Sequence, residues 1–315
     1  MLYYLTNKID KINKGKIDKN MQLSKIIWII INILTNIFST INYKIINVYY
    51  GYRCEWILTL SIFTLWPVSY ITVYKGSIWN IIKIYGPYIV IIGVLDSVQN
   101  TLLCICLNYI TASEYIICRT TSMLFNFFIK MYMDKKIKWQ ILAANISVFL
   151  SIGFLLSDLQ SSYTYFLLCF LASFVYSIEN YLTEKKLDKD NLLIINPLIN
   201  TVSFFTFIVF FSIFSLVNYS LILEQFNLLF SQSLTFFFLL FSLGFCQLFI
   251  NISRLYIVTF FDSLAINIVD VVRRCTVILL SIIFLNDIPS VSKIHSLLFM
   301  ILGCLVYIIP DSFVF

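Results

Sequence analysis

The feature that most constrains the fold is the succession of long apolar runs, which leave only short polar turns between them. Each run is long enough for a helix of about 20 residues, the length that crosses the hydrocarbon core of a bilayer. Of the 315 residues, 60% are hydrophobic and 12% are charged, about half the charged fraction of a typical soluble domain. This composition excludes a soluble enzyme, a nucleic-acid-binding module and a disordered chain. It predicts an all-α protein of the lipid bilayer.

Hydropathy and polar turns divide the chain into ten expected transmembrane helices. The expected spans are 24–46, 54–74, 84–107, 110–133, 138–156, 163–182, 193–217, 233–254, 259–285 and 291–309. Residues 1–23 form a basic segment without the continuous apolar core of a signal peptide, so the first span is expected to target the protein. Residues 310–315 are expected to form a short tail.

The distribution of positive charge predicts the orientation. If the N-terminus is cytosolic and the spans alternate, most of the 22 Lys and Arg residues, Arg254 among them, fall on the cytosolic side. That asymmetry agrees with the positive-inside rule and predicts that both termini are cytosolic. Arg119, Arg273 and Arg274 remain within the expected membrane spans.

An internal repeat appears when residues 118–156 are compared with residues 272–309. Each segment has a basic residue early in one helix, a short polar turn and a second helix with one glycine, Gly153 or Gly303. We expect these glycines to allow close helix approach. Two halves with five spans each must be inverted relative to one another, as in many secondary transporters. The expected halves are residues 24–157 and 158–309.

Motifs for other chemistry are missing from the sequence. It contains no Walker loop, no paired-histidine metal motif and no GxSxG elbow, so we expect no enzyme activity, metal site or cofactor. The eight cysteines lie mostly in apolar runs without zinc or redox spacing, and we expect them to be packing residues.

Charged residues inside the expected spans are therefore the candidate functional groups, because each costs about 2.5–3.5 kcal/mol on insertion scales. Asn267, Asp270 and Arg274 would share one helix face. An ion pair between Asp270 and Arg274 is a structural alternative, but one acid cannot neutralise Arg119, Arg273 and Arg274 together.

A second polar stripe joins Asp96 and Asn100, and Asp96 could pair with Arg119. Arginine favours planar recognition of phosphate or carboxylate, so these positions predict a small anionic metabolite as ligand. Tyr115 lies in the same expected span as Arg119 and could stack a base. The candidate substrate-binding residues are Arg119, Arg273, Arg274, Asn267, Asp270, Asp96, Asn100 and Tyr115.

The ten expected spans in two inverted halves resemble the drug/metabolite transporter superfamily. Within it, residues 272–284 are similar to the penultimate helix of nucleotide-sugar transporters, with a basic pair, β-branched and small residues, a serine and an aromatic. Residues 286–289 and 303–307 also fit that pattern. Residues 118–122 resemble the basic-plus-serine segment of the UDP-N-acetylglucosamine/UDP-xylose branch. The related sugar-phosphate/phosphate translocators carry a Lys-Arg pair at the corresponding place.

The resemblance implies an antiporter that exchanges a nucleotide sugar, with a UDP-sugar favoured, for a nucleoside monophosphate across a Golgi or endoplasmic reticulum membrane. Arg273 and Arg274 would hold the phosphates from one half, and Arg119 would approach from the other. The mechanism would be alternating access about a site at the bilayer midplane. A homodimer formed through lipid-facing helices is compatible with the resemblance.

Three functions stay open at this point. The first is the nucleotide-sugar or sugar-phosphate exchanger. The second is a chloroquine-resistance-type carrier of cationic or neutral metabolites, with a plastid-type or digestive organelle membrane as the alternative location. The third is a membrane scaffold or receptor without a connected cavity. The sign of the charge that lines the central cavity should distinguish them.

Overall fold

The computed structural model describes residues 26–47, 49–52, 55–66, 78–110, 112–134, 139–156, 163–187, 191–261 and 290–308, together with the helical residues Ile266, Val269, Asp270 and Thr276. Within these residues all regular structure is helical. The helices are Ile26–Asn47, α2 (Glu55–Thr64), α3 (Ile78–Tyr109), α4 (Ala112–Asp134), α5 (Trp139–Leu156), α6 (Tyr163–Lys186), α7 (Leu192–Val217), α8 (Tyr219–Phe230), α9 (Leu234–Phe260) and α11 (Val291–Ile308).

Five segments in the described part are long and apolar enough to cross a membrane. They are Ile26–Asn47, Ile81–Leu107, Tyr163–Lys186, Ile194–Val217 and Leu234–Thr259. α5 and α11 carry the shorter apolar helical segments Leu142–Phe154 and Ile294–Gly303. The described part is therefore all-helical, and its five apolar helices indicate a multi-pass membrane protein, as the hydropathy predicts.

Most helices coincide with expected spans, but several details differ. α3 begins at Ile78, so Pro87 lies inside the helix rather than at its start. α8 occupies the stretch expected to be a loop between two spans. α2 ends at Thr64, before the expected end at residue 74. α9 continues to Phe260, past its expected end at residue 254 and the expected start of the next span at residue 259. Residues 1–25 and 309–315 lie outside the described residues, so the expected terminal segments stay predictions.

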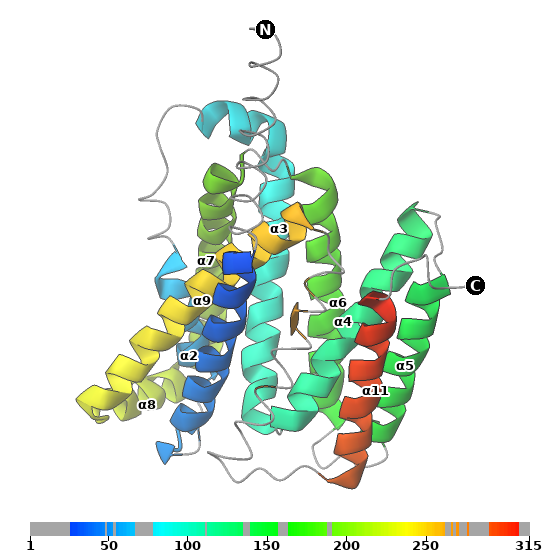
Figure 1. Cartoon of the computed structure of the whole chain (residues 1–315). Helices are drawn as coiled ribbons and strands as arrows, with labels where there is room; N and C mark the ends of the chain where they lie inside the picture. Colours follow the sequence, from blue (N-terminus) through cyan, green and yellow to red (C-terminus); the bar gives the residue numbers. More distant parts are fainter. Residues whose placement is uncertain are drawn as a thin grey trace, which may run out of the picture.

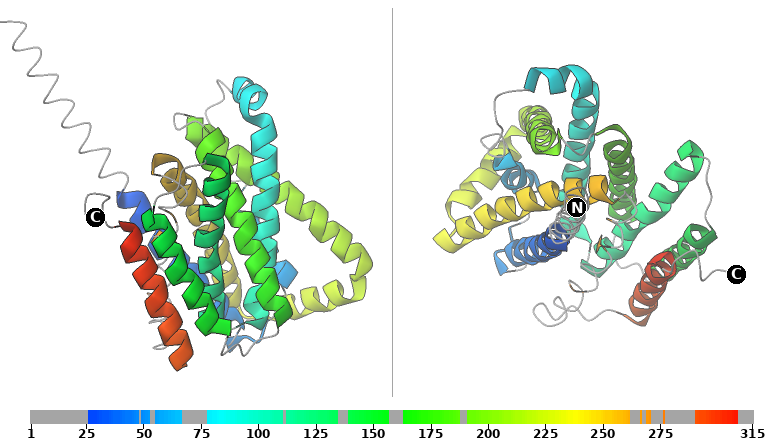
Figure 2. Two further views of the ribbon diagram at one scale, coloured as in Figure 1. Left: turned by 90° about the vertical axis from the view of Figure 1, so that its right-hand side faces the viewer. Right: turned by 45° about the horizontal axis from the view of Figure 1, so that its top comes forward.

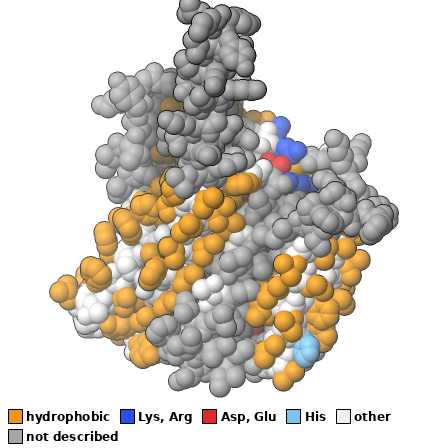
Figure 3. Space-filling model, viewed as in Figure 1, with side chains coloured by type: hydrophobic (Ala, Val, Ile, Leu, Met, Phe, Trp, Pro, Cys, Tyr) orange, Lys and Arg blue, Asp and Glu red, His pale blue; other side chains and the backbone are white. Residues whose placement is uncertain are grey.

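The outer surface is apolar and the interior is unusually polar. Leu216 and Leu234 are 84% and 87% exposed, whereas Asp96, Glu179 and Arg254 are buried. On the face shown in Figure 3, hydrophobic side chains cover the described helices, and the visible Lys, Arg, Asp and Glu side chains gather at one end. This distribution suits lipid contact outside and polar contacts between helices inside.

α3 packs along both α6 and α7, while α5 and α11 pair at one edge of the bundle (Figures 1 and 2). A side chain at Gly303 would place its Cβ 2.8 Å from the carbonyl oxygen of Ala144 in α5. The expected close approach is confirmed at Gly303 but is wrong at Gly153, where a Cβ would have no described atom of another helix within 4 Å. Ser296 of α11 also donates a hydrogen bond to the carbonyl oxygen of Ser151 at 2.6 Å.

Buried thiols help to hold α3, α4 and α6 together. Cys106, Cys118 and Cys169 lie in one apolar cluster with Phe166 and Ala172. The cysteines that the structure describes are thiols rather than disulfides. Their burial among apolar side chains agrees with the expected packing role. The cluster fixes the segment of α4 that carries the neighbouring Arg119.

Candidate substrate-binding site

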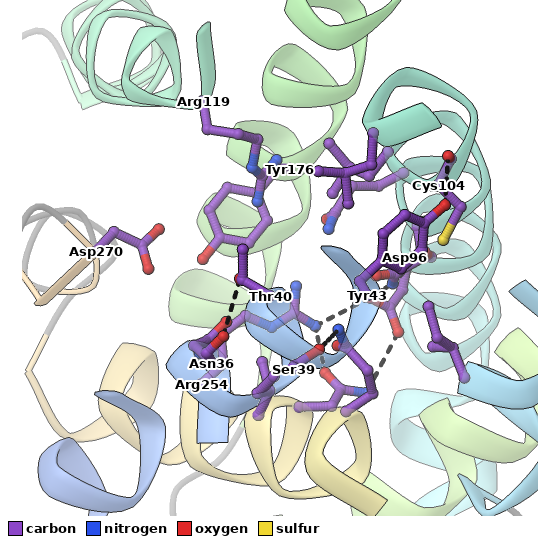
Figure 4. A pocket seen from close by; sticks show the side chains of 18 of the residues that line it. Asn36, Ser39, Thr40, Tyr43, Asp96, Cys104, Arg119, Tyr176, Arg254 and Asp270 are labelled. Atoms are coloured by element: carbon purple, nitrogen blue, oxygen red, sulfur yellow. Dashed lines mark hydrogen bonds and ion pairs between the residues drawn. The ribbon is translucent and has the colours of Figure 1, made fainter. Parts of the chain in front are cut away.

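A polar cavity of about 90 Å³ lies in the interior of the bundle (Figure 4). Its walls come from the Ile26–Asn47 helix, α2, α3, α4, α6 and α9, with Asp270 completing them. A cavity volume of about 10–15 Å³ holds one water molecule, so this cavity has room for several waters or a small polar group.

One wall is a polar face on an otherwise apolar helix. Asn32, Asn36, Ser39 and Tyr43 line the cavity from the Ile26–Asn47 helix. Their spacing of four, three and four residues places them on one face. Tyr43 donates a hydrogen bond to a backbone carbonyl of α3 at 2.9 Å, and Asn32 donates one to a hydroxyl of α9 at 2.9 Å. The helix is thereby fixed in rotation with its amides toward the cavity.

Arg119 of α4 supplies unused hydrogen-bonding capacity to the cavity. Its side chain is 4% exposed, and Nε and Nη1 have no hydrogen-bond partner in the part of the chain that the structure describes. The guanidinium carbon lies 4.4 Å from the centroid of the Tyr176 ring, a distance at which a cation–π interaction stabilises the charge. Asp270 interacts with Arg119 electrostatically, and Figure 4 shows both side chains reaching toward the same space beside Tyr176.

A buried ionic cluster lies behind this space. Nη2 of Arg254 in α9 lies 2.6 Å from Oε1 of Glu179 in α6 and 3.3 Å from Oδ1 of Asp96 in α3. The same nitrogen donates to Oδ1 of Asn251 at 2.6 Å. We call Arg254, Glu179 and Asp96 the buried triad. Arg254, which the charge distribution assigns to the cytosolic side, is 5% exposed and ion-paired inside the bundle rather than placed in a loop.

Asp96 is fully engaged within the triad. One carboxylate oxygen accepts from Asn100 at 3.0 Å and from Arg254. The other accepts from Ser203 at 3.2 Å and from Asn251 at 3.3 Å. Its described ionic partner is thus Arg254, whereas the sequence suggested Arg119. Four donors from three helices, α3, α7 and α9, stabilise the charged form of this carboxylate.

The structure brings together all five of the predicted site residues that it describes. The residues Arg119, Asp96, Asn100, Tyr115 and Asp270 all line the cavity. Asn267, Arg273 and Arg274 lie outside the described residues, so their roles and the Asp270–Arg274 pair stay predictions.

Sequence reasoning missed the cavity residues Asn36, Tyr176, Asn251 and Arg254. The spacing of polar residues in the sequence was a signal for Asn251 and Arg254. Gln247, Asn251 and Arg254 follow at i, i+4 and i+7 and therefore share one face of α9. The polar face of the first helix gave a similar signal.

Comparison with known proteins adds information on the fold alone. No family model matches the chain, and no curated protein matches it. The fold resembles that of a protein of solved crystal structure, with a TM-score of 0.54 at 10% sequence identity, over 88% of this chain and 97% of the other. The helical arrangement is therefore shared along almost the whole length of that protein.

Proposed function

We propose that the protein is a secondary-active carrier of a small anionic metabolite, whose anionic group binds Arg119. The observation that carries this proposal is the buried guanidinium with two nitrogen atoms, Nε and Nη1, that lack a described hydrogen-bond partner. A buried polar group without a partner is costly, and a charged one more so. A phosphate or carboxylate supplies paired acceptor oxygens that match the planar donors of arginine.

The position of the cavity supports alternating access. The Ile26–Asn47 helix, α3 and α4 belong to the expected first half, while α6, α9 and Asp270 belong to the expected second half. A site between two halves is accessible from either side of a membrane when the halves rock against each other. The pairing of α5 with α11, the last helix of each expected half, is also consistent with an inverted repeat in a drug/metabolite transporter fold of ten spans.

The size of the cavity bears on the substrate. The resemblance favours a nucleotide sugar exchanged for a nucleoside monophosphate at the Golgi or endoplasmic reticulum, with both termini cytosolic and with Arg273 and Arg274 as phosphate ligands. A cavity of about 90 Å³ is smaller than the usual ligand pocket of about 300–1,000 Å³. A nucleotide sugar would therefore require substantial opening, whereas inorganic phosphate or a sugar phosphate requires less.

One observation favours a second candidate, a carrier of cationic or neutral metabolites. Asp96 and Asp270 both line the cavity, and Arg254 is held in an ion pair. A cationic substrate would then bind near Asp270. Arg119 argues against this candidate, because its guanidinium would repel a cation in the same space.

Counterflow in proteoliposomes tests the proposal. Vesicles preloaded with inorganic phosphate, a sugar phosphate, a UDP-sugar or an organic amine are assayed for uptake of the same labelled compound. We expect an anion to exchange and Arg119→Gln to reduce that exchange at least tenfold, because a charge-assisted pair is lost.

Lys130→Gln is the matched control, since Lys130 is also on α4 but pairs with Glu184 away from the cavity. Its exchange should equal that of the wild type. Exchange of the amine alone, or unchanged anion exchange by Arg119→Gln, would contradict the proposal. No exchange of any compound would favour the scaffold function instead.

A further inference from the structure

The buried triad contains one more carboxylate than it has guanidinium groups. Arg254 faces both Glu179 and Asp96 through one nitrogen atom. The side chains of Glu179 and Asp96 are 0% and 2% exposed, so water does little to screen their repulsion. Two carboxylates that share one cation in such surroundings favour a state in which one of them is protonated.

Hydrogen bonding identifies the carboxylate that takes the proton. Both oxygens of Asp96 accept hydrogen bonds, from four donors in total. Glu179 accepts from Arg254 on Oε1, while its buried Oε2 has no hydrogen-bond partner among the described side chains and backbone. Protonation of Asp96 would disrupt an organised set of donors, whereas protonation of Glu179 at Oε2 disrupts none of the described hydrogen bonds.

The charged and titratable groups around Glu179 come from every helix packed against α6. α3 contributes Asp96, α4 contributes Arg119 and α9 contributes Arg254. On α6 itself, Tyr176 lies one turn before Glu179. The Tyr176 ring lies between the two arginines, 4.4 Å from the guanidinium carbon of Arg119 and 5.6 Å from that of Arg254. The triad and the proposed anion site are thus separated by one aromatic ring.

We propose that Glu179 is a proton-binding site coupled to the anion site at Arg119, so that the carrier moves its anionic substrate together with a proton. This proposal rests on the proposed function. A proton from the aqueous phase binds Oε2 of Glu179 and removes one negative charge beside the cavity. An anion then binds Arg119 more tightly, and by linkage the bound anion tightens proton binding by the same factor. When the carrier opens to the other side of the membrane, it releases the anion and the proton.

The strength of the coupling follows from the geometry. Glu179 is in contact with Arg254. The guanidinium carbons of Arg254 and Arg119 lie 5.6 Å and 4.4 Å from the centroid of the Tyr176 ring, so the two guanidinium groups are at most about 10 Å apart. Over about 10 Å, at an effective dielectric constant of about 20, one charge changes the affinity for a univalent anion on the order of tenfold. We therefore expect anion affinity to rise on the order of tenfold when Glu179 becomes neutral.

Infrared difference spectroscopy tests the proton site without requiring transport. The reconstituted full chain is titrated between about pH 5 and about pH 9, where a perturbed carboxyl group would change its protonation. We expect a carbonyl band of a protonated carboxyl group that is lost in Glu179→Gln and retained in the control Glu184→Gln. Glu184 lies on the same helix and pairs with Lys130 away from the cavity. A spectrum that is identical for wild type and Glu179→Gln across the range would overturn the proposal.

A second measurement tests the coupling, with inorganic phosphate as the probe. Proteoliposomes with a pH gradient should accumulate phosphate in the wild type and in Glu184→Gln. Glu179→Gln should lose accumulation driven by the gradient while retaining phosphate counterflow, because its site is permanently neutral. Counterflow without any effect of the gradient in the wild type would refute proton coupling and leave the proposed function standing. If the wild type itself showed no anion counterflow, that result would instead refute the proposed function.

Discussion

Removing the positive charge of Arg254 should destabilise the folded protein strongly. In Arg254→Met, the side chain keeps a similar apolar length, but Glu179 and Asp96 lose their shared cation. Removal of one partner from a buried ion pair costs about 3–5 kcal/mol, because it leaves an uncompensated buried charge. The upper part of that range applies here, since Arg254 bonds to two carboxylates and to Asn251 as well.

A second substitution should restore part of the lost stability. In the double variant Arg254→Met with Glu179→Gln, one of the two carboxylates is neutral. The other, Asp96, retains hydrogen bonds from Asn100, Ser203 and Asn251. We expect the double variant to be more stable than Arg254→Met by about 1–3 kcal/mol, the usual size of the coupling energy between contacting groups.

Unfolding in mixed micelles, with a denaturing detergent titrated against a mild one, measures these free energies. Lys130→Met is the control, because its pair with Glu184 is partly exposed, with side chains 16% and 18% accessible. Exposed pairs contribute about 0–1 kcal/mol. Two results would contradict a stabilising role of Arg254 between the two carboxylates. One is that Arg254→Met unfolds at the same detergent fraction as Lys130→Met. The other is that adding Glu179→Gln to Arg254→Met destabilises the protein further.

Three further substitutions test the packing of α5 against α11. Gly303→Ala should destabilise the protein by about 1–3 kcal/mol, because the new Cβ would meet the Ala144 carbonyl oxygen at 2.8 Å. Gly153→Ala should be neutral, or stabilising by up to about 1 kcal/mol, because no described atom of another helix lies within 4 Å of the new Cβ and alanine favours the helix. Ser296→Ala should cost about 1 kcal/mol through its lost hydrogen bond to Ser151. Thermal unfolding of fluorescently tagged protein in detergent ranks the three, and an inverted order of the two glycine variants would contradict the packing.

The positions of the helices could be predicted because hydropathy is a local property of the sequence. α4, α5 and α7 begin and end within about two residues of the expected spans. α8 escaped prediction because Glu224, Gln225 and Asn227 interrupt its apolar residues, and the stretch then resembles a loop. The same stretch contains no glycine or proline, so nothing in it opposes a helix.

The sequence predicted most of the charged residues that line the cavity, but it did not predict which of them pair with one another. Asp96, Arg119 and Asp270 stood out because a charge within an apolar run is costly. Arg254 did not, since a charge near the expected end of a span usually reaches the membrane surface. Which carboxylate meets which arginine depends on the rotation and approach of separate helices. Asp96 therefore binds Arg254 in α9, a pairing that helix periodicity alone does not specify.

The charge that lines the cavity depends on the protonation of the buried triad. Within the buried triad, Arg254 faces two carboxylates, Asp96 and Glu179. The excess negative charge of the triad is relieved by a proton on Glu179 or by a bound cation. The two candidate carriers therefore respond to acid in opposite directions. Anion uptake should rise as the external pH falls, because protonation of Glu179 removes one of the negative charges near Arg119. Uptake of a cation should fall, because protons compete for the same negative charge. The direction of the pH dependence identifies the sign of the substrate, whatever its structure.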